Sequence, residues 1–306
     1  MEIVKQTFSS ARPKPARRVS FLAGLHGDEL EGVYLCFLLV QYLRRLKETE
    51  PGAFLGEVNV YPAVNPQALC HGSRLWPFFS VDMNRLMGEP AGNSLPAGAC
   101  RELLADLKGC SDLAVDLHSS NQHLAELPQI RIVKDFEKKL LPLALQCNVD
   151  VIWVHPMAGV FESTLGYNLN RAKVPTLVME LGICLRIHRD FCSQILDGAI
   201  HLLHHAGVLN SSRRPRGEIK MPLVLKADQV GLVQAKRAGL FAGRVKLGDR
   251  VGKGDKIGDV VDPVRGETLE EVVSPFKGTI FTLRELPLIY EGAPLVRVAL
   301  DGPDER

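Results

Sequence analysis

Three side chains in this sequence combine the types and positions needed to hold a divalent metal ion. His26 and Glu29 lie three residues apart in residues 24–29 (GLHGDE). His118 directly follows residues 115–117 (VDL), which are apolar except for Asp116. Imidazole nitrogens and carboxylate oxygens suit zinc, and a catalytic zinc site uses three protein ligands and keeps one position open. We therefore expect His26, Glu29 and His118 to bind one Zn2+ per chain.

The HxxE pattern alone is weak, because a loop histidine before a glutamate at a helix start is common. The metal interpretation is favoured by His118, which ends an apolar strand in a hydrophilic loop, where a core role is improbable. Three more histidines, His201, His204 and His205, share a predicted helix. They could form a metal-binding face, but no acidic third ligand accompanies them.

Glu180 is the candidate for proton transfer. Glu180 directly follows residues 176–179 (TLVM), a predicted apolar strand. Burying a carboxylate there costs free energy unless the carboxylate is paired or takes part in the chemistry. A general acid/base role is one interpretation, and membership of a buried ion pair is the other.

The elements that must position these residues read as strands alternating with helices. A strand over 18–25 leads through the GLHGDE loop into a helix whose apolar residues begin at Leu30. Further strands are expected at 56–64, 112–117, 130–133, 151–155 and 176–181, and helices at 100–108, 136–147 and 191–206. This alternation predicts an α/β fold with a parallel or mixed sheet, whose carboxyl edge carries the chemistry.

The last ninety residues follow a different pattern. Residues 210–217 (NSSRRPRG) resemble a linker, so we expect one domain over 1–208 and a second over 218–306. The second contains short runs that predict an all-β domain, at 231–235, 239–245, 256–261, 271–273, 278–283 and 294–298.

Composition excludes several classes of function. A net charge of +2 over 306 residues gives no reason to expect a nucleic-acid or membrane partner. Seven cysteines without a CxxC pair indicate reduced thiols, and the absence of a secretory pattern predicts a cytoplasmic protein. A homo-oligomer is compatible with this composition.

Several motifs in order resemble the succinylglutamate desuccinylase and aspartoacylase family, relatives of the zinc carboxypeptidases. They are HGDE, 64–66 (VNP), 82–85 (DMNR), 116–118 (DLH), 179–182 (MELG) and the C-terminal β segment. The resemblance implies a mixed sheet flanked by helices, with a smaller barrel-like all-β domain capping the active site. It also implies zinc on His26, Glu29 and His118, Glu180 as general acid/base, and cleavage of the amide bond of a small N-acyl amino acid.

The resemblance assigns five further residues to the substrate. Asn84 and Arg85 match a dyad that grips the substrate carboxylate, although without the resemblance they read as a turn and a surface arginine. Arg74 corresponds to an arginine that polarises the scissile carbonyl, in a loop about three residues longer than usual. Arg171 and Tyr290 resemble additional pocket positions.

Two alternatives to an N-acyl amino acid hydrolase stay open from sequence. One is a carboxypeptidase-like hydrolase of short peptides or other small amides, against which a capping domain argues because a roofed pocket excludes long chains. The other is a non-catalytic metal-binding or carrier module. Lys277 lacks the Ala-Met-Lys-Met context of a carrier attachment site.

Overall fold

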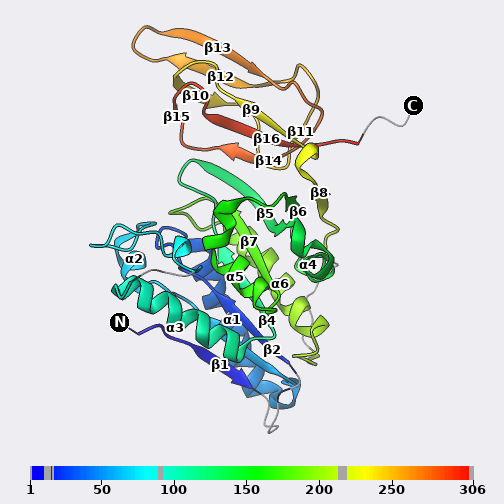
Figure 1. The fold of residues 1–306 in the computed structure, drawn as a ribbon. Coiled ribbons are helices and arrows are strands. Elements are labelled where there is room, and N and C mark those ends of the chain that lie inside the picture. Colours follow the sequence, from blue (N-terminus) through cyan, green and yellow to red (C-terminus); the bar gives the residue numbers. More distant parts are fainter. Residues whose placement is uncertain (1, 10–14, 16, 89–91, 213–218, 303–306) are drawn as a thin grey trace.

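The computed structural model describes residues 2–9, 15, 17–88, 92–212 and 219–302. A twelve-stranded mixed sheet runs through the molecule in the order β1-β3-β2-β4-β7-β5-β14-β16-β9, with β6, β8 and β11 paired beside this path (Figure 1). Its strands are β1 (Gln6–Ser9), β2 (Arg18–Leu22), β3 (Glu57–Tyr61), β4 (Leu113–His118), β5 (Leu124–Val133), β6 (Val151–His155), β7 (Thr176–Gly182), β8 (Leu223–Leu225), β9 (Val230–Gln234), β11 (Arg250–Val251), β14 (Gly278–Arg284) and β16 (Pro294–Leu300).

The centre of this sheet is parallel. Strand β2 pairs with β3 and β4, and β4 pairs with β7, all in parallel register. Every residue of β4 is buried, as expected for a strand covered on both faces. The carboxyl ends of β2, β4 and β7 therefore meet at one edge, and the predicted α/β fold with a mixed sheet is confirmed.

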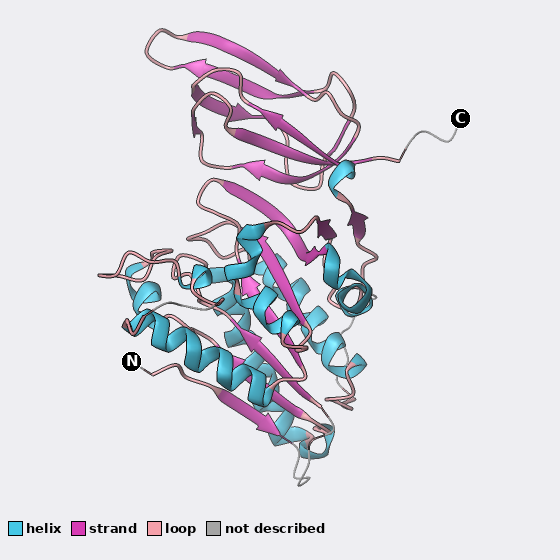
Figure 2. Cartoon of the chain, viewed as in Figure 1, coloured by secondary structure: helices cyan, strands magenta, loops and turns pink. Residues whose placement is uncertain are grey.

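Helices cover both faces of the sheet (Figure 2). They are α1 (Leu30–Thr49), α2 (Pro66–His71), α3 (Leu95–Cys110), α4 (Glu137–Ala144), α5 (Leu165–Arg171) and α6 (Arg189–His205), with 3-10 helices at Pro51–Ala53, Met83–Arg85, Lys134–Phe136, Gly159–Ser163 and Ala227–Gln229. Apolar residues of α1 and α6 share one buried cluster, whereas those of α3 and α5 share another. Because side chains alternate along a strand, the two clusters lie on opposite faces.

Several predicted boundaries were wrong. The strand expected over 18–25 ends at Leu22, the helix expected over 100–108 spans Leu95–Cys110, and the strand expected at 271–273 begins at Glu267. The strand expected at 130–133 begins at Leu124, because β5 continues through a register shift between Glu126 and Gln129. The helix expected over 136–147 begins with a 3-10 turn and ends at Ala144. Most of the expected linker, residues 213–217, lies outside the described residues.

Apart from the 3-10 helix Ala227–Gln229, the described residues of the C-terminal part, 219–302, form strands and loops. A four-stranded antiparallel sheet, β13-β12-β10-β15, packs over the strands that end the large sheet, and one apolar cluster fills the space between them. These strands are β10 (Gly239–Gly243), β12 (Lys256–Asp262), β13 (Glu267–Val273) and β15 (Leu288–Ile289). Strand β14 also pairs with β5 of the N-terminal part, which fixes the C-terminal strands beside the carboxyl edge of the sheet.

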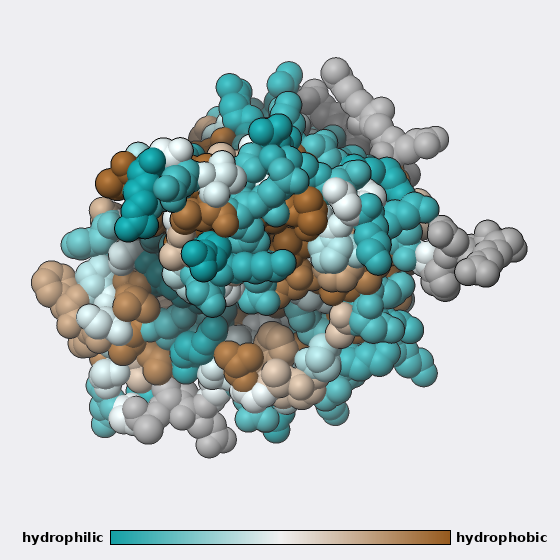
Figure 3. Space-filling model, turned by 90° about the horizontal axis from the view of Figure 1, so that it is seen from above, coloured by the Kyte–Doolittle hydropathy of each residue, from teal (hydrophilic) through white to brown (hydrophobic). Residues whose placement is uncertain are grey.

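Polarity is mixed on the face of the molecule that Figure 3 shows. Seen from above, hydrophobic side chains are interspersed among hydrophilic ones (Figure 3). Within the described residues, no helix has the length and apolar character needed to cross a bilayer. All seven cysteines are free, and five of them are buried.

Candidate active site

The three predicted metal ligands lie at or after the carboxyl ends of two neighbouring strands. His26 lies in the loop after β2, Glu29 immediately precedes α1, and His118 is the last residue of β4. Gly27 permits this loop, because a Cβ at that position would lie 1.9 Å from the carbonyl carbon of Ala68. Since β2 and β4 are parallel neighbours, residues that follow them meet at the same edge.

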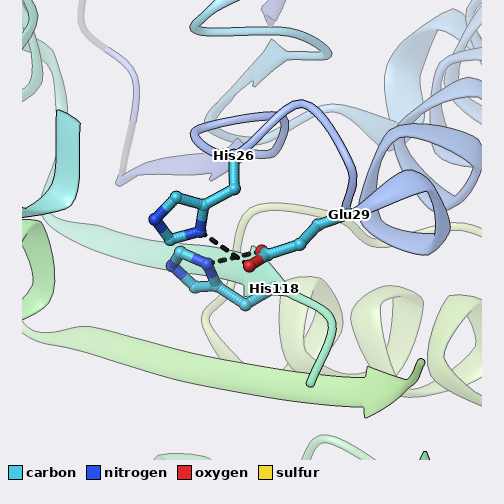
Figure 4. A group of neighbouring side chains, drawn as sticks. All are labelled: His26, Glu29 and His118. Carbon is cyan, nitrogen blue, oxygen red and sulfur yellow. Dashed lines mark hydrogen bonds and ion pairs between the residues drawn. The ribbon is translucent and has the colours of Figure 1, made fainter. Parts of the chain in front are cut away.

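The ligand atoms of these residues converge (Figure 4). His26 Nδ1 lies 2.6 Å from Glu29 Oε1, and His118 Nδ1 lies 2.8 Å from Glu29 Oε2. All three side chains are buried, and one ligand atom from each falls within 4.8 Å of the others. Two imidazole nitrogens and a carboxylate form a donor set that suits a borderline cation such as zinc.

The electrostatics of the triad follow from these contacts. Burial alone would raise the pKa of Glu29, but the adjacent His26 and His118 outweigh it and lower the pKa to about 2. Burial likewise disfavours the charged imidazoles, whereas Glu29 and Asp116 raise the pKa of His118 well above its usual value. Protons and a divalent cation would thus compete for the same ring nitrogens.

Other candidate ligands behave differently. Asp28, Glu29 and Cys184 also come close enough to hold a cation, but this group shares Glu29 with the triad. The helical histidines contact protein atoms: His201 Nδ1 lies 3.1 Å from the Gln146 carbonyl oxygen. Neither it nor its helical neighbours belongs to a metal-binding group among the described residues.

Asp82 links the triad to Arg74. Its Oδ1 lies 3.0 Å from His26 Nε2, and its Oδ2 accepts from Arg74 Nη2 at 2.8 Å. Arg74 Nη1 lies 3.4 Å from Glu29 Oε1, so the guanidinium borders the triad. His26 and Arg74 outweigh burial and hold the pKa of Asp82 well below its usual range.

Glu180 lies at the same edge of the sheet. It is the strand partner of His118, and its side chain is 13% exposed. Arg131 Nη1 lies 3.3 Å from Glu180 Oε1. Burial raises the pKa of Glu180 to about 7, although Arg131 and His118 oppose this rise. A carboxylate that titrates near neutrality can both take and return a proton.

Arg131 also connects Glu180 to the C-terminal part. Its Nη2 donates to Glu126 Oε2 at 2.6 Å, and Glu126 is 1% exposed. The other carboxylate oxygen of Glu126 accepts from Thr282 Oγ1 on β14 and from Arg297 Nη1 on β16, each at 3.4 Å. A chain of charged contacts thus joins Glu180 to two C-terminal strands.

A cavity of about 320 Å³ collects most of the predicted residues. This volume falls at the small end of the range of roughly 300–1,000 Å³ found for ligand pockets. The predicted site residues that line it are His26, Glu29, Arg74, Asn84, Arg85, His118 and Glu180. Arg297 lines it as well, so the C-terminal part contributes to its wall.

Asn84 and Arg85 stand at the cavity in a fixed arrangement. They belong to the 3-10 helix Met83–Arg85, and Asn84 Oδ1 accepts from the Leu165 amide at 2.8 Å. The Asn84 Nδ2 amide is consequently the part left for a ligand. Arg85 is exposed, and its Nη1 donates to the Asn84 carbonyl oxygen at 3.0 Å.

Two residues implied by the resemblance do not join this group. Arg171 is exposed, and its guanidinium lies 5.9 Å from the ring centre of Tyr167. Tyr290 follows β15 and is 66% exposed. Neither lines the cavity, whereas Asn170 does.

Sequence reasoning assigned no role to three residues that contact the predicted site. Asp82 contacts His26 and Arg74, Arg131 contacts Glu180, and Asp116 Oδ2 lies 3.1 Å from His118 Nε2. Asp116 carried a usable signal, since it is the one charged residue in an otherwise apolar strand that ends at His118.

Solved structures share this fold. A succinylglutamate desuccinylase/aspartoacylase from Rhodobacter sphaeroides is 23% identical with a TM-score of 0.79, covering 99% of this chain and 90% of that chain. The product-bound ectoine utilization protein EutE of Ruegeria pomeroyi is 21% identical with a TM-score of 0.78 (98% and 89%). A succinylglutamate desuccinylase from a Silicibacter species is 20% identical with a TM-score of 0.75 (96% and 88%).

Comparison with curated proteins gives no match. The model of the succinylglutamate desuccinylase/aspartoacylase catalytic domain, however, matches residues 15–206, well over half of the chain. This range contains the triad, Arg74, Asn84, Arg85 and Glu180. The chain therefore belongs to the succinylglutamate desuccinylase/aspartoacylase family.

Proposed function

We propose that this protein is a zinc-dependent hydrolase that cleaves the amide bond of a small N-acyl amino acid. The observation that carries the proposal is the arrangement around one small cavity: a His-Glu-His donor set, a carboxylate with a pKa near neutrality, and an arginine available for a carboxylate. Membership of a family named for a desuccinylase and an acylase supports the type of reaction.

His26, Glu29 and His118 would hold the metal. A zinc ion there supplies a Lewis acid that polarises a carbonyl oxygen and lowers the pKa of water. Asp82 is hydrogen-bonded to Nε2 of His26, so it would orient that ring and favour Nδ1 as the ligand atom. Asp116 lies 3.1 Å from Nε2 of His118 and places a negative charge beside that ring.

Glu180 would move the proton. As water forms a bond to the carbonyl carbon, Glu180 takes a proton from that water, and it returns the proton to the amide nitrogen as the carbon–nitrogen bond breaks. The products are a carboxylic acid and a free amino acid. Burial raises the pKa of Glu180, which helps this carboxylate to hold the proton between the two transfers.

Arg85 and Asn84 would bind the substrate carboxylate, and Arg74 would stabilise negative charge on the carbonyl oxygen. A guanidinium offers two parallel donors to a carboxylate, and the Asn84 amide adds a third. Arg74 borders Glu29 through its Nη1, which puts a positive charge beside the triad.

The test is a substrate panel assayed with the zinc-loaded protein and with Glu180→Gln. We expect hydrolysis of N-acyl amino acids and a loss of at least about a hundredfold in kcat for Glu180→Gln. Zinc content should not change in this variant. A clear preference for tripeptides over N-acyl amino acids, or near-normal turnover by Glu180→Gln, would contradict the proposal.

A further inference from the structure

Apolar side chains gather on one side of the cavity, where Thr164, Asn170 and Thr176 also line it. On the side of α5 it is lined by Val133, Phe136, Phe161, Tyr167 and Val178, which we call the apolar recess. All five side chains are partly buried and line the cavity, and Phe136 also packs against the apolar core. The rings of Phe136 and Tyr167 meet edge to face, with their centres 5.6 Å apart.

The cavity offers few positive charges that could pair with a second substrate carboxylate. Arg74 is paired with Asp82 at 2.8 Å. Arg131 lies 2.6 Å from Glu126 and 3.3 Å from Glu180, and Arg297 lies 3.4 Å from Glu126, so these two guanidiniums face two carboxylates. Each of these guanidiniums therefore already has an anionic partner.

Two basic side chains remain to be considered. Burial, with help from Arg131 and Arg297, lowers the pKa of His155 to about 4, so this imidazole is neutral at pH 7. Arg85 is exposed, and within the described part of the chain it forms no ion pair with a carboxylate. The cavity thus offers one unneutralised guanidinium, enough for one substrate carboxylate.

Arg85 and the apolar recess are neighbours. The hydrogen bond from the Leu165 amide to Asn84 Oδ1 fixes the Asn84-Arg85 pair against the start of α5. The next residue, Gly166, lines the cavity beside the recess. In an N-acyl amino acid the carboxylate, the acylated nitrogen and the side chain share one carbon. With the carboxylate at Arg85 and the amide at the triad, the side chain is left within reach of the recess beside α5.

We propose that the apolar recess receives the side chain of the amino acid, and that the substrates are N-acyl derivatives of apolar amino acids with a single carboxylate. This inference rests on the proposed function and specifies its substrate. Burial of an apolar side chain against Val178 and the aromatic rings favours binding, whereas a second carboxylate would lose its hydration there without gaining a cation.

The first test holds the acyl group constant. The zinc-loaded protein is assayed with the N-acetyl derivatives of leucine, methionine and phenylalanine and with those of aspartate and glutamate. We expect kcat/KM at least about tenfold higher for the apolar group. Equal or higher values for aspartate or glutamate would overturn the inference and leave the proposed function intact. Failure to cleave any derivative would overturn both.

The second test narrows the recess. A Cβ at Gly166 would lie 2.5 Å from Val178 Cγ2, so Gly166→Ala must push this side chain or occupy space beside it. We expect the ratio of kcat/KM for N-acetylphenylalanine to that for N-acetylalanine to fall about tenfold or more. Both substrates are measured in one sample, so the ratio does not depend on the folded fraction.

The matched control is Gly109→Ala, near the end of α3. A Cβ there meets no atom within 4 Å, and Gly109 does not line the cavity. The same ratio should stay at the wild-type value in this variant. An unchanged ratio in Gly166→Ala would overturn the placement of the side chain in the recess.

Discussion

Replacing Arg131 by methionine should lower the free energy of unfolding and remove the cation that contacts Glu180. Arg131 is the closest cation to Glu126, at 2.6 Å, and Glu126 is 1% exposed. Removing one partner of a fully buried ion pair costs about 3–5 kcal/mol. Arg297 stays 3.4 Å from Glu126, and the Arg131 side chain is 31% exposed, so we expect a smaller loss of about 2 kcal/mol in the free energy of unfolding.

A double-mutant cycle separates this ion pair from general packing damage. Urea unfolding is measured for the wild type, Arg131→Met, Glu126→Gln and the double variant. Because the buried charge left by either single change is absent from the double variant, its destabilisation should be about 1–2 kcal/mol smaller than the sum of the single changes. Additive losses would refute the reasoning, because they would mean that the two side chains do not interact.

The same variant has a kinetic signature. Arg131 lowers the pKa of Glu180, so removing Arg131 should raise that pKa from about 7 to a higher value. A general base must be deprotonated to act, and the acid limb of kcat/KM should therefore move to higher pH in Arg131→Met. An acid limb at the wild-type position would show that Arg131 does not act on Glu180.

Three further predictions concern the triad, the carboxylate clamp and the cavity wall. His118→Ala should lose zinc, as measured by metal analysis, because the two remaining protein ligands leave the ion under-coordinated. His201→Ala should keep its zinc. A full zinc content in His118→Ala would exclude His118 as a ligand. Arg85→Lys should lower kcat/KM roughly ten- to a hundredfold for a substrate that carries the carboxylate, which corresponds to about 1.5–3 kcal/mol of lost binding free energy. The loss should be far smaller for a matched substrate with an amide in place of the carboxylate, and equal losses would exclude Arg85 as the residue that binds the carboxylate. Burial lowers the pKa of His155 to about 4 in the folded protein, against 6.5 in the unfolded chain. As the pH falls from 6.5 to 4, the free energy of unfolding of the wild type should therefore decrease more steeply than that of His155→Gln. Urea unfolding that gives the same pH dependence for both proteins would contradict this.

The edge of the sheet that carries the site could be predicted from sequence. Apolar runs ending at Leu25 and Leu117 mark strands, and polar residues directly after them fall at the carboxyl edge of an α/β sheet. That His26 and His118 come together depends on β2 and β4 being neighbours. Local pattern does not determine the order of strands, so the ordered motifs supplied the missing step.

The contacts that join Glu180 through Arg131 and Glu126 to the C-terminal strands could not be predicted from sequence. Glu126 and Gln129 interrupt the apolar pattern of β5, and the contacts of Glu126 come from Arg131 and from two C-terminal strands. One of the partners of Glu126 is Arg297, 171 positions away along the chain. No local signal connects two residues so far apart.

Arg171 shows a different limit. Successive residues of a helix point about 100° apart, so an offset of one position decides whether a side chain faces the cavity or the solvent. In α5, Asn170 lines the cavity and Arg171 is exposed. Motif spacing alone does not fix that rotation.

The central claim is that His26, Glu29 and His118 hold a zinc ion on which amide hydrolysis depends. The most direct measurement determines zinc per chain and hydrolysis of an N-acyl amino acid in the same sample, before chelation, after it, and after zinc is added back. We predict one zinc per chain, loss of hydrolysis as the zinc is removed, and recovery when it returns. Full hydrolysis by protein shown to contain no metal would contradict the account.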